Sequence, residues 1–126
     1  MRTRMYYKWQ DFIFCLKKIF VYPFQRFFRG YSDVDLWNLD AFYSEIIVKS
    51  MKAFKEKTIA YPPVISFEKW QEILDDIIFA FEHEGTDWYD LELKEKNLTE
   101  AEKAEIAKRV DRGFEYFKEY YRALWW

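Results

Sequence analysis

Apolar residues recur at helical spacing along most of this chain, and the pattern predicts four helices. The clearest repeat falls between residues 67 and 84, where apolar side chains return every third or fourth position and so share one helix face. Its members are Trp70, Ile73, Leu74, Ile77, Ile78 and Phe81. The same spacing predicts further helices over about residues 5–21, 36–57 and 99–124.

Capping and helix-breaking residues predict where these helices begin and end. Pro23 should stop or kink the first helix, because its ring and missing N–H disrupt helical hydrogen bonds. Ser66 precedes the third helix and Gly85 follows it, and these residue types favour helix starts and ends. Thr99 with Glu102 three positions later is a capping box, which starts the last helix.

Residues 86–98 do not follow the helical pattern. Tyr89, Leu91 and Leu93 alternate with charged residues, which is typical of a short strand or an ordered loop. With only three Gly and three Pro, the chain favours long helices over a many-turned sheet protein. We therefore expect an all-α fold of about four helices in a compact bundle, with one short extended segment near 88–94.

The net charge of -2 conceals two parts of opposite sign. Residues 1–30 carry seven basic side chains against one acidic side chain, whereas the rest of the chain is acidic. We expect a single helical domain over 1–126, with a basic aromatic N-terminal segment (1–30) and an acidic helical body (31–126). Oppositely charged parts usually pack together or alternate between protomers, so we do not expect a nucleic-acid partner.

No segment of the sequence is suited to crossing a membrane. The most apolar stretch, residues 12–24, is interrupted by Lys17 and Lys18 and is shorter than a span. Its lysines and aromatics would also suit a position on a membrane surface, but docking on its own domain is the favoured interpretation. The one cysteine, Cys15, has apolar neighbours, which predict a buried thiol in a reducing cytoplasm.

Aromatic side chains make up 23% of the chain, more than we expect so small a domain to bury. The chain finishes with Trp125 and Trp126, which are poor residues for a frayed end. We expect both to be buried, against the body or against another protomer. A homo-oligomer is therefore predicted, since large apolar patches usually mark interfaces. The alternative is a compact monomer with a crowded aromatic core.

The sequence lacks the usual patterns of catalytic and cofactor sites. His83 is the only histidine, and three glycines do not provide a phosphate-binding loop, so we expect no cofactor, no metal site and no enzymatic activity. Two carboxylate pairs have i, i+3 spacing: Glu72 with Asp75, and Glu102 with Glu105. All-α NTP pyrophosphohydrolases bind Mg²⁺ with such pairs, but their denser acidic motif is missing here. A Mg²⁺-dependent nucleotide hydrolase is therefore the least favoured alternative.

The densest cluster of polar and aromatic residues spans residues 26–40. Ser32 and Asp35 have the spacing of a helix N-terminus, although a break at Asp40 is also consistent with the pattern. In such a helix Asp33, Trp37 and Asp40 share one face, just after two arginines. Backbone N–H groups and arginines together suit an anion, and an aromatic ring could stack on a base. The candidate ligand-binding residues are Arg26, Arg29, Tyr31, Asp33, Trp37 and Asp40.

A simpler interpretation of this cluster involves no ligand. The two arginines would pair with Asp33 and Asp35, and Trp37 would pack in the core. We favour this interpretation, because oppositely charged neighbours in sequence commonly pair with each other.

Arg29-Gly30-Tyr31-Ser32-Asp33, followed by Asp35, Trp37, Leu39 and Asp40, resembles the signature of a family of small proteins from tailed bacteriophages and prophages. The resemblance continues at Tyr61-Pro62, at residues 67–74 and at residues 113–125. It implies a viral protein that acts in the host cytoplasm, and it assigns no catalytic residue. Relatives in that family often end in Leu-Trp-Asp, where this chain has Leu124-Trp125-Trp126.

The leading hypothesis is a non-enzymatic phage accessory protein, a homo-oligomeric binding module that counters host defence. Its partner would be a small nucleotide signal, which it would sequester, or a host protein, which it would block. The alternative is a phage structural or DNA-associated protein that uses the basic segment 1–30. Binding to DNA through phosphates would depend strongly on salt.

Overall fold

The structure, a computed structural model, describes the backbone of residues 4–125 and the side chains of residues 7–125. Within this part of the chain the fold is all-α, without any strand, as the sequence predicts. The chain divides into two compact units, Met1–Leu39 and Asp40–Trp126, named here the N-terminal unit and the helical body. Each unit is described by itself. The predicted single domain stays a prediction.

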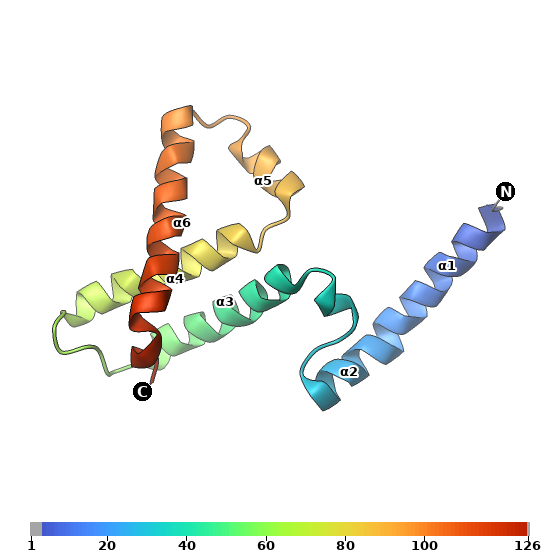
Figure 1. Cartoon of the computed structure of the whole chain (residues 1–126), viewed down its shortest axis with the longest axis horizontal. Helices are drawn as coiled ribbons and strands as arrows, with labels where there is room; N and C mark the ends of the chain where they lie inside the picture. The colour runs from blue at the N-terminus through green and yellow to red at the C-terminus, as the bar shows by residue number, and fades with distance from the viewer. Residues whose placement is uncertain (1–3, 126) are drawn as a thin grey trace. The chain divides into compact units, whose positions relative to one another are not determined.

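The N-terminal unit consists of one long helical run, α1 continuing into α2 in Figure 1, and a short 3₁₀ turn. The elements are α1 (Arg4–Leu16), the π-helical turn η1 (Lys17–Val21), α2 (Tyr22–Arg29) and the 3₁₀ turn η2 (Val34–Leu36). Helical backbone continues past Pro23, so the predicted stop is not found there. The N–H of Tyr22 donates to the carbonyl of Lys17, and this wider turn accommodates the proline that follows.

The helical run ends at Gly30, which has a φ of 83°. A glycine adopts this left-handed conformation without strain, and its N–H donates to the Arg26 carbonyl at 2.9 Å. After the 3₁₀ turn, regular helix resumes only at Leu39, one residue before Asp40. A continuous helix from Ser32 is therefore wrong, the break near Asp40 that the pattern also allowed is found, and Asp33, Trp37 and Asp40 do not share one helical face.

The helical body contains the other four α-helices (Figure 1). They are α3 (Leu39–Lys57), α4 (Phe67–Glu84), α5 (Trp88–Glu95) and α6 (Glu100–Tyr120), and the 3₁₀ turn η3 (Tyr121–Ala123) follows α6. The predicted caps are confirmed: Ser66 Oγ accepts the Lys69 N–H at 3.1 Å, and Thr99 and Glu102 form both bonds of the capping box. Gly85 ends α4 as predicted.

The helix α5 replaces the extended segment predicted near residues 88–94. Its N-terminus is capped by Asp87, whose carboxylate accepts the Tyr89 N–H at 2.9 Å. The alternation of apolar and charged residues is typical of a strand, but it is too short to distinguish a strand from a short capped helix. The aspartate directly before the segment is the sequence signal that favours the helix.

The core of the body lies between α3, α4 and α6. All six residues of the predicted stripe on α4 are buried, and Trp70, Leu74 and Ile77 are completely inaccessible. They pack against Met51 of α3 and against partly buried side chains from α6, and Trp70 meets the Tyr120 ring edge-on at 5.6 Å. Burial raises the pKa of the Tyr120 hydroxyl.

The helix α6 crosses α4 at a steep angle in Figure 1, and Gly113 allows their backbones to touch. A Cβ at Gly113 would lie 2.2 Å from the Asp76 carbonyl oxygen and 2.5 Å from the Ala80 Cβ. Near this crossing, Arg109 and Arg112 of α6 each donate to the Asp76 carboxylate at 3.0 Å. A small residue and one carboxylate on α4 thus fix where the two helices meet.

Two expectations about buried residues are wrong for the chain by itself. Trp125 is 66% exposed, and Trp126 lies outside the described residues. Cys15 is exposed, because its apolar neighbours lie on the continuous run of α1, η1 and α2, and no described element of the same unit packs over this run. Apolar neighbours in sequence show that a surface is apolar, but not that another element covers it.

Candidate functional site

Five of the six candidate residues lie where α2 ends and the chain turns. Arg26 and Arg29 are in the last turn of α2, Tyr31 and Asp33 follow Gly30, and Trp37 comes directly after the 3₁₀ turn. Asp40 is an exposed residue in the first turn of α3 and belongs to the helical body.

Asp35 is the buried centre of this turn, with a side chain only 5% exposed. Its carboxylate accepts hydrogen bonds from both Nε, at 2.9 Å, and a terminal nitrogen of Arg26. The Ser32 backbone N–H donates to the same carboxylate at 2.7 Å. The hydrogen bonds from Arg26, and then those from Ser32, hold the pKa of Asp35 well below its usual range, even though burial opposes this shift.

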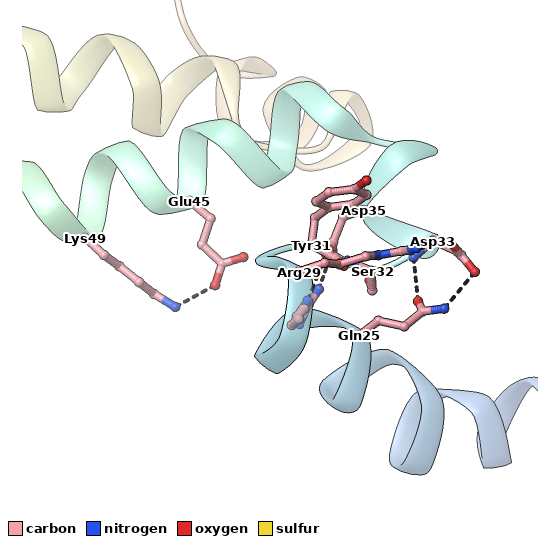
Figure 2. A network of polar contacts seen from close by, with 9 residues as sticks. Gln25, Arg29, Tyr31, Ser32, Asp33, Asp35, Glu45 and Lys49 are labelled. Carbon is pink, nitrogen blue, oxygen red and sulfur yellow. Dashed lines mark hydrogen bonds and ion pairs between the residues drawn. The ribbon is translucent and has the colours of Figure 1, made fainter.

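Gln25 holds Asp33 through two reciprocal hydrogen bonds, which Figure 2 shows as dashed lines. The Gln25 amide donates to the Asp33 carboxylate at 2.9 Å, and the Asp33 N–H donates to the Gln25 oxygen at 2.8 Å. Arg29 pairs with the other carboxylate oxygen of Asp33. The hydrogen bonds from Gln25 and Arg29 lower the pKa of Asp33. The role of Gln25 could not be predicted from the sequence, because an amide at this position matches no motif.

Arg29 also contacts Tyr31 in two ways. Its Nε donates to the Tyr31 carbonyl at 2.9 Å, and its guanidinium lies 4.5 Å from the centroid of the Tyr31 ring. This stacking is a cation–π contact within the turn, so the ring face toward Arg29 is occupied. Gln25, Arg26, Arg29, Asp33 and Asp35 together are named the polar clamp.

The polar clamp confirms the simpler interpretation in one respect and corrects it in another. The arginines do pair with Asp33 and Asp35, as that interpretation predicted. Trp37, however, is 82% exposed and does not fill the core. It follows a 3₁₀ turn of only three residues, which gives the side chain no packed helix face to occupy.

The geometry of the clamp leaves little capacity for an added anion. Each arginine already faces a carboxylate, and the Ser32 N–H, which a helix start would offer to a phosphate, is bonded to Asp35. The two residues most suited to neutralise a phosphate therefore hold the chain's own turn together. The clamp fixes the end of the long helix.

A second feature of the N-terminal unit is a row of exposed apolar side chains along its helical run. We name this row the aromatic face, and its members are Trp9, Phe12, Leu16, Phe20, Phe24 and Phe28. All six are exposed, and ring contacts join Trp9 to Phe12 at 5.8 Å and Phe24 to Phe28 at 4.4 Å. Among described residues of this unit, only Ser32 and Asp35 are buried.

The π-helical turn keeps the aromatic face on one side of the helix. Side chains spaced four apart drift around an α-helix, because four residues exceed one turn of 3.6. Leu16, Phe20 and Phe24 are spaced in this way across η1 (Lys17–Val21), where the wider π turn reverses the drift. The predicted apolar face therefore extends beyond the predicted helix end, to Phe28.

Lysines border the aromatic face. By helix geometry Lys18 lies on the opposite side, whereas Lys8 and Lys17 lie toward the two edges. All three are exposed, and none forms a salt bridge with a described residue. The aromatic face is thus a continuous apolar row bordered by lysines, and further exposed apolar side chains, among them Phe14, Ile19 and Phe27, lie outside it.

The carboxylates considered for metal-dependent hydrolysis are engaged in the body's own contacts. Asp75 pairs with Lys55 at 2.6 Å, Glu72 with Lys69 at 3.4 Å, and Glu102 belongs to the capping box. His83 Nε2 lies 3.1 Å from Glu95 Oε1. Within residues 4–125, no three His, Cys, Asp or Glu side chains are grouped so that they could hold a metal ion.

A cavity of about 250 Å³ lies between α4, α5 and α6. Phe79, His83, Leu91, Leu98 and Ile106 are among its lining residues. It is smaller than the usual pockets for small-molecule ligands, which span roughly 300–1,000 Å³. Two larger hollows of the body, of about 620 Å³ beside α5 and about 480 Å³ between α3 and α4, are each lined in large part by charged side chains.

No protein-family model, curated protein or solved structure matches this chain. None of the helices between residues 4 and 125 is long and apolar enough to span a bilayer.

Proposed function

We propose that the protein is a non-enzymatic phage accessory protein that acts by binding, and that the aromatic face is its binding element. The observation that carries this proposal is the exposure of all six residues of the face in a unit whose described residues form one continuous helical run and a short 3₁₀ turn. Large contiguous apolar surfaces on proteins usually mark interaction sites. The helical body, with its own core, would then serve as the folded platform that carries the binding element.

The energetics of the aromatic face support binding. Burying one Phe or Leu side chain completely contributes roughly 1.5–3 kcal/mol. Six such side chains provide a driving force well beyond the few kcal/mol that a weak complex needs. A homo-oligomer is the form that we propose on the basis of the aromatic content of the whole chain, since the helical body also has exposed rings.

The polar clamp does not favour the version of this function in which a nucleotide signal is sequestered. Its arginines are matched by carboxylates, whereas nucleotide sites need unmatched cations for the phosphates. Binding to a macromolecular partner, of which blocking a host protein is one form, agrees better with an extended apolar face. The proposed setting is the host cytoplasm.

Two measurements on the full chain test whether the aromatic face binds. Light scattering reports self-association, and the dye ANS reports an accessible apolar surface. We expect a mass that rises above 15.7 kDa with concentration, or strong ANS fluorescence at the monomer mass. The double variant Phe20→Ser/Phe24→Ser should weaken whichever signal is present severalfold. The matched control, Trp88→Ser/Tyr89→Ser, removes two equally exposed rings from α5 and should change it little.

A chain that stays monomeric and binds no ANS would overturn the proposal. That result would mean that the chain covers its own aromatic face. An equal loss in the α5 control would also overturn it, because the signal would then reflect aromatic content in general and not this face.

A further inference from the structure

We infer that the partner of the aromatic face is the surface of an anionic lipid bilayer. This inference rests on the proposed function, since it assigns an occupant to the same face. Three observations carry it: the kind of apolar residues in the face, the cations around it, and the length of the helical run.

The residues of the face are those that favour the boundary between lipid headgroups and acyl chains. Five of the six are Trp or Phe, and the sixth is Leu. Helices that lie in this boundary have Trp, Phe and Leu on one side and Lys or Arg on the other. The seams of coiled coils are instead rich in Leu, Ile and Val, which interlock as knobs into holes. Only Leu16 among the six residues of the face is of this kind.

The charges around the face complement an anionic surface. Asp11 is the only acidic residue among residues 1–30, and Lys8, Lys17 and Lys18 form no salt bridge with a described residue. Lysines at the edges of an apolar face can extend their ammonium groups to the headgroups while their carbon chains stay in the apolar layer. Two copies laid face to face would instead bring these cations near one another, which weakens self-association.

The length of the run indicates that the helix lies along the membrane and does not cross it. Residues 4–29 are helical throughout, which gives roughly 39 Å at 1.5 Å per residue. The polar side of the run carries Lys17 and Lys18 in its middle, where a span would place lipid tails. The π-helical turn keeps the face continuous, so that all of it can enter the surface together.

The test is flotation of the full-length protein with lipid vesicles of two compositions. One is phosphatidylcholine with one quarter phosphatidylglycerol, and the other is phosphatidylcholine alone. We expect at least tenfold tighter binding to the anionic vesicles at low salt, and a loss of this preference in 0.5 M salt. Each basic residue near such a surface contributes about fivefold.

Two variants separate the apolar and the charged contributions. Phe20→Ser/Phe24→Ser should reduce binding to both vesicles at least tenfold, because it removes the inserted rings. Lys17→Glu/Lys18→Glu should reduce binding to anionic vesicles at least tenfold with little effect on the neutral ones. The control, Lys57→Glu/Lys118→Glu, changes the net charge equally through exposed residues of the body and should retain the anionic preference. Circular dichroism checks that each variant keeps the wild-type helix content.

Hydrogen exchange provides a readout that does not depend on variants. Anionic vesicles should slow exchange of the amides in residues 4–29 severalfold and leave α4 and α6 unchanged.

The inference is overturned if wild-type protein binds neither vesicle, if 0.5 M salt leaves binding unchanged, or if the body control loses as much as the lysine variant. Failure of this inference differs from failure of the proposed function. If the chain does not bind vesicles but self-associates through Phe20 and Phe24, only the lipid surface is contradicted as the partner. If the chain also binds no ANS and stays monomeric, both this inference and the proposed function are contradicted.

Discussion

Asp35 shows how one buried carboxylate can fix the end of a long helix. It joins Arg26, in the last turn of α2, to the Ser32 N–H beyond Gly30. Asp33 repeats the arrangement on the exposed side, where Gln25 and Arg29 hold it. The turn thus depends on side chains of the preceding helix, which lie four to nine positions before their partners, and not on a cap at the start of the helix that follows.

The clamp should open in acid. Because the pKa of Asp35 is lower in the folded chain than the unfolded value of about 4, its contribution to stability is complete above pH 4. It is lost progressively as the pH falls toward the folded pKa. We expect the amide resonance of Ser32 to titrate with a midpoint well below pH 4. In Arg26→Gln the midpoint should rise, because Arg26 is the largest cause of the shift. An unchanged midpoint would contradict this assignment.

Asp76 has a comparable role within the body. Its largely buried carboxylate serves two arginines of α6, Arg109 and Arg112, at 3.0 Å each. Asp76→Ala should lower the free energy of unfolding by about 1–3 kcal/mol, because hydrogen bonds to a charged group are lost. Glu72→Ala, on the same helix, removes an exposed pair and should cost less than about 0.5 kcal/mol. Urea denaturation of both variants measures the difference, and equal effects would argue against the Asp76 contact.

At the scale of the elements, the crossing of α4 and α6 decides the architecture of the body. The stripe on α4 supplies the apolar surface, but many partners and angles would cover it. Gly113 selects this crossing, since only a residue without a Cβ allows the approach to Asp76 and Ala80. Gly85, at the end of α4, allows a close approach to α3 in the same way, because a Cβ at this position would lie 2.7 Å from the Ser44 Cβ.

Gly113→Ala tests this crossing. In an exposed helix the change from Gly to Ala is stabilising by about 1 kcal/mol. Here the added methyl group must force two backbones apart, so we expect the free energy of unfolding to fall by about 1–3 kcal/mol. The change in the free energy of unfolding therefore has opposite signs with and without the close helix crossing, so its measurement distinguishes the two cases. Glu115→Ala, an exposed position two residues further on, should stay within about 0.5 kcal/mol of wild type.

At the scale of the whole molecule, the two units differ in how much they bury. The body contains every residue of the hydrophobic core, whereas the described part of the N-terminal unit buries only Ser32 and Asp35. Local stability follows buried apolar contacts. The N-terminal unit should therefore unfold locally at a lower free energy than the helical body.

Native-state hydrogen exchange of the chain in dilute buffer should show this difference directly. Amides in α4 and α6 should exchange only through global unfolding, while those in α1 should exchange orders of magnitude faster at concentrations where the chain is monomeric. Comparable protection throughout the chain would contradict this prediction. It would also mean that another surface already covers the aromatic face.

Local signals in the sequence predicted the local features of this protein well. Each correctly predicted feature depends on residues within a few positions of one another. These features are the stripe from Trp70 to Phe81, the caps at Ser66 and Thr99, and the helix end at Gly85. The pairing of the arginines with Asp33 and Asp35 was predicted because all four charges lie within ten residues of the chain. The helix α5 was missed because an eight-residue element carries too few apolar positions to reveal its period.

Residue type and spacing along the chain are enough to predict the all-α class, the apolar stripes and the charge division. What each stripe faces depends on tertiary packing. It placed α4 inside the body, left the aromatic face and Trp37 exposed, and used Gln25 to close the polar clamp. The physical reason is that burial depends on which elements approach each other, and such approaches rest on contacts such as that of Gly113 with Asp76, 37 residues apart in the chain.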